Sequence, residues 1–281
     1  MANTLTERLL PWRNRIDELD RQILELLNER ARAALEVGKI KQDFNTEEVI
    51  LKPEREARIV RRLQSENIGP FTPAAVEAVW GQIISACRGL ESVLRVAYLG
   101  PQGSFSEQAA YEHFGHALDG LQCDSFDEVF RSVEVGQAEV GMVPVENSTE
   151  GAVNRTLDLL LNSPLRVLGE RSIRVHHNLL TQTGTMEGVT RVMAHPQALA
   201  QCQNWLSQHL PRAERRAVAS NAEGARLAAT DPAWAALASE RAAAQFGLHI
   251  VSHAVQDEAY NRTRFAVICL PQTLAMPPAS G

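Results

Sequence analysis

Three cationic side chains occupy positions in the N-terminal segment that a folded helix would bury. Arg13, Arg30 and Lys41 fall on one stripe, at spacings of three, four or seven, with the apolar residues Ile16, Ile23, Leu27, Ala34 and Val37. This spacing predicts a single helix over about residues 11–42. Buried unpaired charge is costly, so the three cations need an anionic partner. For any one of them, snorkelling to solvent or an internal salt bridge is an equally good explanation; for all three together, a bound polyanion is the better one.

Two shorter helices are predicted to bring carboxylates and further polar groups to the same core. Pro53 is a typical first helical residue, and it is followed at once by Arg55 and Glu56. A third helix is predicted from the Thr72-Pro73 cap to about residue 90. Its stripe consists of Val76, Trp80, Ile83, Cys87 and Glu91. The chemistry this predicts is the binding of a polyanion in a helical core.

The first predicted helix is too long for one compact domain. Roughly 32 residues at about 1.5 Å each span roughly 48 Å, whereas a domain of this size is only about 30 Å across. We therefore expect a homodimer in which two long helices cover each other.

From Arg95 onward, strand patterns alternate with helical ones, which predicts an α/β sheet domain. Strands are expected at 95–100, 140–146, 189–195, 215–220 and 262–270. Helices are expected at 106–114, 126–136, 151–161, 196–210 and 232–246. Ligands of such folds bind beyond the carboxyl ends of strands.

Four polar motifs stand next to these predicted strands. They are GPQGSFS at 100–106, VPVENSTEGAV at 143–153, HPQALAQC at 195–202 and NRTRF at 261–265. Each has an ordinary structural explanation when taken alone. The first reads as a turn, the second as helix capping, the third as a histidine before a first-turn proline, and the fourth as an unremarkable strand.

Composition narrows the class of protein. The 281 residues carry a net charge of −6, which argues against a general nucleic-acid binder. Four widely spaced cysteines form no obvious metal site or disulfide framework, so we expect a reducing cytoplasm and no metal. No secretory signal and no membrane-length apolar run is found in the sequence.

The segment from Trp12 to Lys41, together with PEREA at 53–57, closely resembles the all-helical chorismate mutase family over about residues 8–92. The resemblance implies a three-helix domain in an intertwined dimer, with Arg13 reaching into the partner's site. Arg13 and Arg30 would bind the carboxylates of chorismate, with Arg55 in support. Glu56 would accept from the ring hydroxyl, and Lys41 would donate to a carboxylate and to the ether oxygen.

Three positions depart from that family's pattern. Lys52 stands where some members have a carboxylate, so a ligand role there is open, and Cys87 replaces a serine. Glu91 replaces a glutamine beside the ether oxygen, where an ionised carboxylate would repel the developing negative charge. We therefore hypothesise mutase activity that rises toward acidic pH.

Together, in this order and spacing, the four motifs closely resemble the prephenate dehydratase family over about residues 94–270. The resemblance implies two α/β subdomains with a cleft, similar to periplasmic binding proteins. Thr263 would help to protonate the leaving hydroxyl of prephenate. The other substrate-binding candidates are Glu146, Asn147, Ser148, Gln201, Ser220 and Arg264. Neither reaction needs a cofactor.

These resemblances imply a two-domain enzyme that converts chorismate to prephenate and then to phenylpyruvate in L-phenylalanine biosynthesis. The expected domains are residues 1–92 and 94–271, followed by a tail at 272–281. Within the second domain, the subdomains would be 94–173 with 251–271, and 174–250. Two alternatives stay open, namely that only the dehydratase is active and that the protein is a small-molecule binding or sensing module. Related proteins often carry a C-terminal regulatory domain that binds phenylalanine. The tail at 272–281 is too short to form another domain, so we expect little feedback inhibition by phenylalanine.

Overall fold

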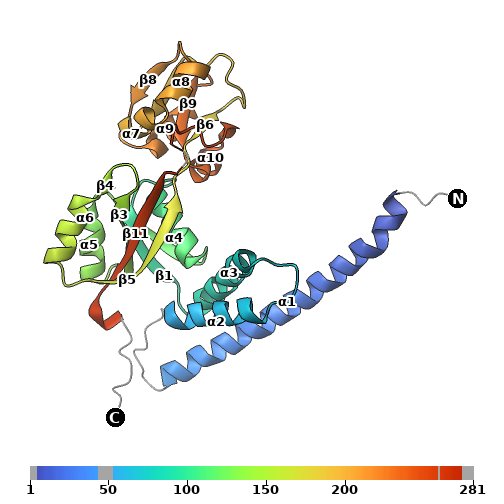
Figure 1. Cartoon of the computed structure of the whole chain (residues 1–281). Helices are drawn as coiled ribbons and strands as arrows, with labels where there is room; N and C mark the ends of the chain where they lie inside the picture. Colours follow the sequence, from blue (N-terminus) through green and yellow to red (C-terminus); the bar gives the residue numbers. More distant parts are fainter. Residues whose placement is uncertain (1–4, 44–52, 259, 274–281) are drawn as a thin grey trace. The chain divides into compact units, whose positions relative to one another are not determined.

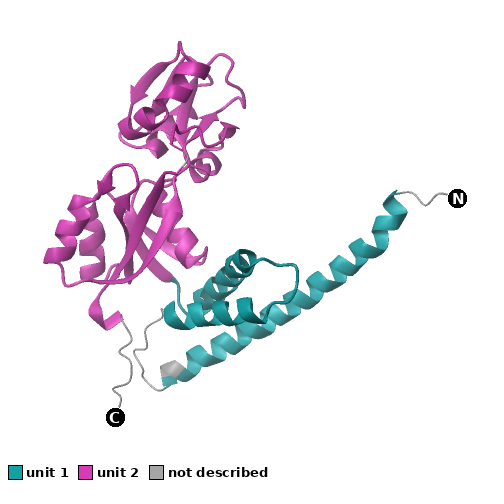
Figure 2. Cartoon of the chain, in the orientation of Figure 1, with its two compact units in different colours: residues 1–93 teal, residues 94–281 magenta. Residues whose placement is uncertain are grey.

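The computed structural model describes residues 5–43, 53–258 and 260–273, without the side chains of residues 41 and 42. The chain divides into two compact units, residues 1–93 and residues 94–281 (Figure 2). Among the described residues, none of the helices has both the length and the apolar character needed to cross a membrane.

The described residues of the first unit form helices and no strands, as the sequence predicts. They are α1 (Leu5–Asp43), α2 (Pro53–Glu66) and α3 (Pro73–Glu91). Thr72 caps α3 by accepting a hydrogen bond from the amide of Ala75 at 3.2 Å, and Pro73 takes the first helical position, which needs no amide donor. Helix α3 packs against both α1 and α2 and contributes the buried residues Val76, Ile84 and Cys87.

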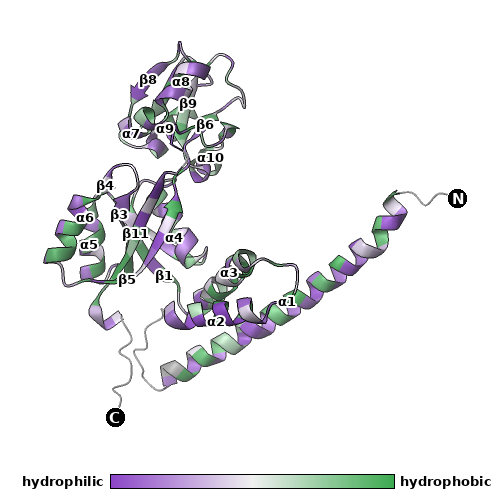
Figure 3. Cartoon of the chain, in the orientation of Figure 1, coloured by the Kyte–Doolittle hydropathy of each residue, from purple (hydrophilic) through white to green (hydrophobic). Residues whose placement is uncertain are grey.

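Helix α1 leaves much of its apolar face uncovered. It has 39 residues, or roughly 58 Å at about 1.5 Å each, and its N-terminal half extends past α2 and α3 (Figure 1). Apolar residues recur along it (Figure 3). The exposed ones at alternating spacings of four and three are Leu5, Leu9, Trp12, Ile16, Leu19, Ile23 and Leu26. This is the repeat of a helix that pairs with another helix.

The first lobe of the second unit is built on a mixed sheet with strand order β2-β1-β3-β11-β5. Its strands are β1 (Leu94–Leu99), β2 (Leu118–Cys123), β3 (Val140–Asn147), β4 (Gly151–Ala152), which pairs with β3, β5 (Arg166–Arg174) and β11 (Arg262–Cys269). Its helices are α4 (Phe105–Phe114), α5 (Phe126–Glu134) and α6 (Asn154–Asn162). The last strand thus returns to the first sheet, where it lies antiparallel between β3 and β5.

The second lobe is built on a sheet with strand order β10-β6-β9-β7-β8. Its strands are β6 (Asn178–Thr181), β7 (Arg191–Ala194), β8 (Glu214–Ala217), β9 (Trp234–Ala238) and β10 (His249–Ser252). Its helices are α7 (Pro196–Gln201), α8 (Gln203–His209), α9 (Asn221–Ala228) and α10 (Glu240–Phe246). Successive buried residues of the strands alternate between two hydrophobic cores, one containing Leu179 and Val192, the other Leu180 and Met193.

The structure corrects two predicted elements here. The helix expected at 232–246 is instead strand β9 followed by α10, because the fully buried alanines of β9 form the centre of a sheet, between β6 and β7. The helix expected at 196–210 is broken into α7 and α8 at Cys202.

The predicted boundary between the lobes is also displaced. The chain returns to the first lobe later than residue 251, because β10 pairs with β6 and the amide of Val255 donates to the carbonyl of His177 at 2.8 Å. Val255 is buried in the core of the second lobe. The strands before Arg262 are short, so their hydrophobic pattern is too weak to show from the sequence where the chain returns to the first lobe.

Two candidate active sites

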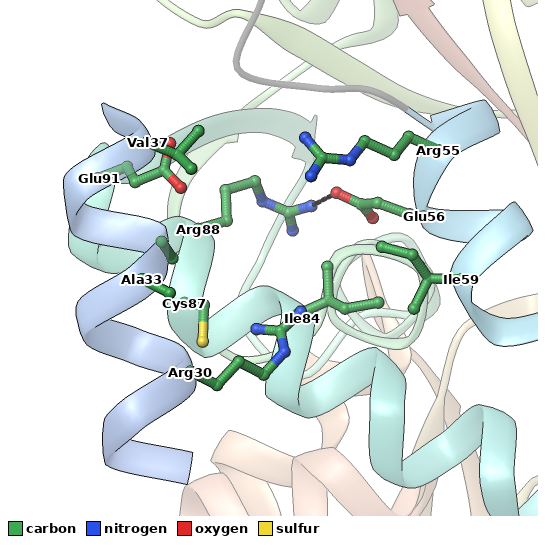
Figure 4. A pocket seen from close by; sticks show the side chains of 11 residues that line it. Arg30, Ala33, Val37, Arg55, Glu56, Ile59, Ile84, Cys87, Arg88 and Glu91 are labelled. Atoms are coloured by element: carbon green, nitrogen blue, oxygen red, sulfur yellow. Dashed lines mark hydrogen bonds and ion pairs between the residues drawn. The ribbon is translucent and has the colours of Figure 1, made fainter. Parts of the chain in front are cut away.

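All three helices of the first unit line a pocket of about 270 Å³ (Figure 4). Its lining residues are Arg30, Ala33, Ala34, Val37, Arg55, Glu56, Ile59, Ile84, Cys87, Arg88 and Glu91. Five of these were predicted as site residues, namely Arg30, Arg55, Glu56, Cys87 and Glu91. The helical spacing that predicts a polar core therefore brings them to one pocket.

Arg88 is a member of this pocket that the sequence analysis missed. Its side chain is 7% exposed and donates to Oε1 of Glu56 at 2.7 Å. A buried guanidinium with a carboxylate partner is tolerated where an unpaired one is not. Its position four residues after Ile84, on the buried face of α3, is the signal that could have identified it.

The pocket combines three guanidinium groups with two carboxylates. Within the described residues, the side chains of Arg30 and Arg55 form no ion pair, so their charge is available to a bound anion. Figure 4 shows Arg30 and Arg55 approaching the pocket from different helices, α1 and α2, with Arg88 and Glu56 between them. Such an arrangement suits a small molecule with more than one carboxylate.

Three other positions considered for this site lie elsewhere or cannot be placed. Arg13 is exposed on α1, 17 residues or roughly 26 Å from Arg30, and does not line the pocket. The side chain of Lys41 and all of Lys52 lie outside the described residues.

In the second unit, the two lobes share a cavity of about 690 Å³. The first lobe contributes Asn147, Thr263 and most of the loop from Gly100 to Ser106 to its lining. The second lobe contributes His177, His195, Gln201 and Ser220. All four sequence motifs therefore meet at one cavity.

A hydrogen-bond network joins the polar groups of this cavity. Thr263 of β11 lies directly opposite Asn147 of β3, and the Asn147 amide donates to Thr263 Oγ1 at 2.9 Å. The same Asn147 amide donates to Asn261 Oδ1 at 3.2 Å, and the Asn261 amide donates to Gln201 Oε1 at 3.0 Å. Gln201 Oε1 is also 2.8 Å from Nε2 of His177, which the sequence analysis did not identify.

His177 is a buried member of this network, and burial lowers its pKa below the ordinary value of 6.5. Its signal in the sequence was alternation, since Ile173, Val175, His177 and Leu179 are all buried. A histidine in that series faces the interior.

Three predicted residues do not line the cavity, because side chains alternate along a strand. Asn147 and Thr263 face inward, whereas Glu146 and Arg264 point outward and form an ion pair at 2.8 Å, both about half exposed. Ser148 donates to the carbonyl of Tyr260 and accepts from the amide of Arg262 at 2.9 Å, so its hydroxyl ties two backbone segments together.

Ser220 and His195 line the cavity but also act as helix caps. Ser220 Oγ accepts from the amide of Glu223 at 3.0 Å, and His195 Nδ1 accepts from the amide of Gln197 at 3.3 Å. Ser104 caps α4 in the same way, through the amide of Glu107 at 3.2 Å. The N-termini of α4 and α9 thus border the cavity and present a partial positive charge to it.

Direct contacts connect the two lobes beside the cavity. Arg241 of the second lobe binds the buried carboxylate of Glu107 at 2.5 Å, and Ser239 Oγ donates to the carbonyl of Gly103 at 2.8 Å. Glu107 also accepts from the hydroxyl of Tyr98, and burial raises the pKa of that hydroxyl. These contacts hold the loop after β1 against the N-terminus of α10.

A helical unit with an arginine-lined pocket and a two-lobed α/β unit with a separate polar cleft define a two-domain protein with two small-molecule sites. The type II chorismate mutase family matches residues 12–92, and the prephenate dehydratase family matches residues 96–273. The chain belongs to the prephenate dehydratase family, and it carries a type II chorismate mutase domain ahead of the dehydratase domain.

Relatives of this chain are described as bifunctional proteins with the same two activities. The bifunctional chorismate mutase/prephenate dehydratase of Neisseria gonorrhoeae is 47% identical over 95% of this chain and 74% of its own length. The protein of the same description from Pseudomonas aeruginosa is 42% identical over 93% of this chain and 73% of its own. Among solved structures, the prephenate dehydratase of Arthrobacter aurescens in complex with L-Phe has a TM-score of 0.60 and 31% identity, covering 66% of this chain and 63% of that one.

Proposed function

We propose that the helical unit rearranges chorismate to prephenate and that the α/β unit converts prephenate to phenylpyruvate, the two steps of one path to L-phenylalanine. The observation that carries the proposal is the occurrence of two separate polar pockets, each formed by the residues through which the chain resembles one of the two families.

In the mutase step, binding does most of the chemistry. Chorismate is a dianion, and its [3,3] rearrangement is unimolecular, so the site must select a compact conformer and stabilise charge on the departing ether oxygen. Arg30 of α1 and Arg55 of α2 bind the carboxylates of chorismate. Arg88 holds one oxygen of Glu56, and the other oxygen accepts from the ring hydroxyl. Lys41 donates to a carboxylate and to the ether oxygen.

In the dehydratase step, Thr263 passes a proton to the substrate, and water replaces that proton on the threonine hydroxyl. Its oxygen accepts a hydrogen bond from Asn147, which leaves its own O–H free to donate to the leaving hydroxyl of prephenate. The ring carboxylate leaves as carbon dioxide, and its bonding electrons form the aromatic ring as the C–O bond to the protonated hydroxyl breaks, releasing water. The N-termini of α4 and α9 suit the negative charges of prephenate.

We further propose that the enzyme is a homodimer that pairs through the exposed apolar face of α1. The repeat from Leu5 to Leu26 continues for more than five helical turns, and water would otherwise cover it. Arg13 lies on this part of α1, beyond the reach of its own pocket, and the paired arrangement lets it enter the partner's. The four cysteines are free thiols, which fits the proposed cytoplasmic location.

Turnover of chorismate and of added prephenate by the full chain tests both sites at once. Wild type is expected to form phenylpyruvate from either substrate. Thr263→Ala is expected to accumulate prephenate from chorismate, while Thr263→Ser retains turnover because a hydroxyl remains. Arg30→Ala is expected to lose chorismate consumption by roughly a hundredfold or more and to process added prephenate normally.

Other outcomes would contradict the proposal in distinct ways. Consumption of prephenate but not chorismate by wild type would leave only the dehydratase. Consumption of neither, with either compound bound, would identify a binding module.

A further inference from the structure

His177 is a buried titratable group that the proposed reaction does not use. Its side chain lines the cleft from the residue just before β6, and its ring meets the edge of Phe105, with 5.7 Å between ring centroids. Its backbone is held on both sides, because its amide donates to Gln256 Oε1 at 3.0 Å and its carbonyl accepts from Val255. A side chain fixed this firmly is suited to positioning a neighbour.

The direction of the hydrogen bonds in the network follows from the backbone. The amides of Thr149 and Glu150 both donate to Asn147 Oδ1, at 2.9 and 3.3 Å, so the other terminal atom of Asn147 is its nitrogen. That nitrogen donates to Asn261 Oδ1, and the Asn261 nitrogen must then donate to Gln201. The atom of Gln201 that receives it is therefore the carbonyl oxygen, Oε1.

This direction determines the protonation of His177. Gln201 Oε1 can only accept, so Nε2 of His177, at 2.8 Å, carries the hydrogen. Nδ1 is buried and has no partner among the described residues, so a hydrogen on it would be an unsatisfied donor, which favours the neutral ring with Nδ1 bare. Burial, which lowers the pKa of His177, favours the same neutral form.

Asn261 and His177 both donate to Gln201 Oε1, and neither contacts the amide nitrogen of Gln201. That nitrogen is buried and has no partner among the described residues, although Gln201 lines the cavity. A buried donor without a partner is costly, and a bound oxygen acceptor would satisfy it.

We infer that His177 is a positioning residue for the dehydratase reaction: as the Nε2–H tautomer it fixes the carboxamide of Gln201, so that the amide nitrogen of Gln201 donates to an oxygen of the substrate. The inference rests on the proposed dehydratase function. Without His177, the carboxamide can rotate and present its oxygen to the substrate instead.

A set of variants of the full chain tests this positioning through activity. His177→Met removes the donor at similar volume, whereas His177→Gln places an amide nitrogen the same number of bonds from the backbone as Nε2. We expect His177→Met to lower kcat/KM for prephenate by roughly tenfold, and His177→Gln to retain most of it. In a Gln201→Ala background, His177→Met should change kcat/KM by less than about twofold, because its effect passes through Gln201. Chorismate consumption in the helical unit is the control for enzyme concentration, and the urea unfolding curve of each variant is the control for folding of the α/β unit.

The tautomer provides a second measurement that does not depend on turnover. Long-range ¹H–¹⁵N spectra of the ¹⁵N-histidine-labelled full chain should show His177 as the Nε2–H form. An Nδ1–H or doubly protonated ring at pH 7.5 would overturn the inference. Equal losses from His177→Met in the wild-type and Gln201→Ala backgrounds would overturn it as well, as would no loss in either. If wild type does not turn over prephenate, the proposed function fails, and the tautomer alone decides whether His177 orients Gln201.

Discussion

Thr263 is identified as the proton donor of the dehydratase step by the direction of its hydrogen bond with Asn147 as much as by its residue type. Thr263 could donate to Asn147 or accept from it. The backbone amides of Thr149 and Glu150 occupy Asn147 Oδ1, so Asn147 presents its nitrogen to Thr263. The threonine hydroxyl is left with its hydrogen for the substrate.

Glu91 should limit the rate of the mutase step. It lines the pocket near the C-terminal end of α3, at the position where the resemblance to the mutase family implies an amide beside the ether oxygen. We predict that Glu91→Gln raises kcat/KM for chorismate at pH 7.5 by roughly tenfold, because an amide donates to that oxygen without repelling its charge. Steady-state kinetics with chorismate measure the change, and turnover of added prephenate is the control. An unchanged or lower kcat/KM would mean that Glu91 does not face the ether oxygen.

The buried His177 should make the α/β unit less stable in mild acid. Burial, the largest cause, lowers its pKa in the folded state below the value near 6.5 of the unfolded chain. Below that pH the unfolded state binds the proton first, so stability falls as the pH decreases from about 6.5 toward the lowered pKa. At pH 5.5 the loss from this one group is at most about 1.4 kcal/mol.

Comparison with His177→Gln isolates that effect from the other seven histidines. We expect the urea midpoint of the wild-type full chain to decrease more between pH 7.5 and 5.5 than that of the variant. Equal decreases would show that His177 is no harder to protonate in the folded protein than in the unfolded one.

At the residue scale, the sequence predicts which residues lie near a site better than it predicts which of their side chains face into it. Asn147, Gln201 and Thr263 could be proposed because their motifs follow or precede strands. Their neighbours Glu146, Ser148 and Arg264 have equally suitable chemistry but face away, and only the register of β3 with β11 distinguishes them. The local pattern could have shown that Arg88 and His177 are buried, but their partners, Glu56 and Gln201, are distant in sequence and could not be predicted from it.

Among the elements, the loop between β1 and α4 depends on a glycine for contact between the lobes. Gly103 has a φ of +83°, and a Cβ there would lie 3.1 Å from the Cα of Ala242 in α10. We predict that Gly103→Ala separates this loop from α10 and lowers kcat/KM for prephenate by roughly tenfold, because the cavity is formed by both lobes.

Gly136 offers a matched control for the backbone strain. Its φ is +74°, but a Cβ there meets nothing within 4 Å. Both alanine variants bear a conformational cost of about 1–2 kcal/mol, and we expect only Gly103→Ala to impair the dehydratase. Equal activity of the two with prephenate would show that the lobe contact is not needed for catalysis.

The exposed apolar face of α1 predicts which substitutions should prevent dimer formation. Burying an isoleucine contributes about 1.5–3 kcal/mol, and a symmetric dimer gains this twice. We predict that Ile23→Asp yields monomers by sedimentation velocity and loses mutase activity, while prephenate turnover persists. Glu25→Lys, on the opposite face of the same helix, should stay dimeric. An active monomeric mutase would contradict a site that needs the partner's Arg13.

At the scale of elements, the sequence identifies long amphipathic helices better than short buried strands. Helix α3 was predicted almost to both ends and α2 was predicted from its first residue, because periodicity and caps are local signals, whereas α1 begins six residues before its predicted start. Strand β9 could not be, since Trp234–Ala238 is rich in alanine and its conformation is set by pairing with β6 and β7.

For the molecule as a whole, each pocket is lined by residues of one unit only. The residues of the arginine-lined pocket fall within 1–93, and those of the polar cleft within 94–281. Two sites built from separate parts of the chain can be inactivated separately, and prephenate released by one molecule can be used by another.

We therefore predict that two inactive variants complement each other in solution. Neither Arg30→Ala nor Thr263→Ala alone should form phenylpyruvate from chorismate, because each lacks one of the two steps. An equimolar mixture should form it after a lag during which prephenate accumulates, as followed by the absorbance of phenylpyruvate in alkali. Each variant supplied with the substrate of its intact site is the control. If Thr263→Ala consumes only about one equivalent of chorismate per site and the mixture forms no phenylpyruvate, prephenate is not released, and the two units do not act independently.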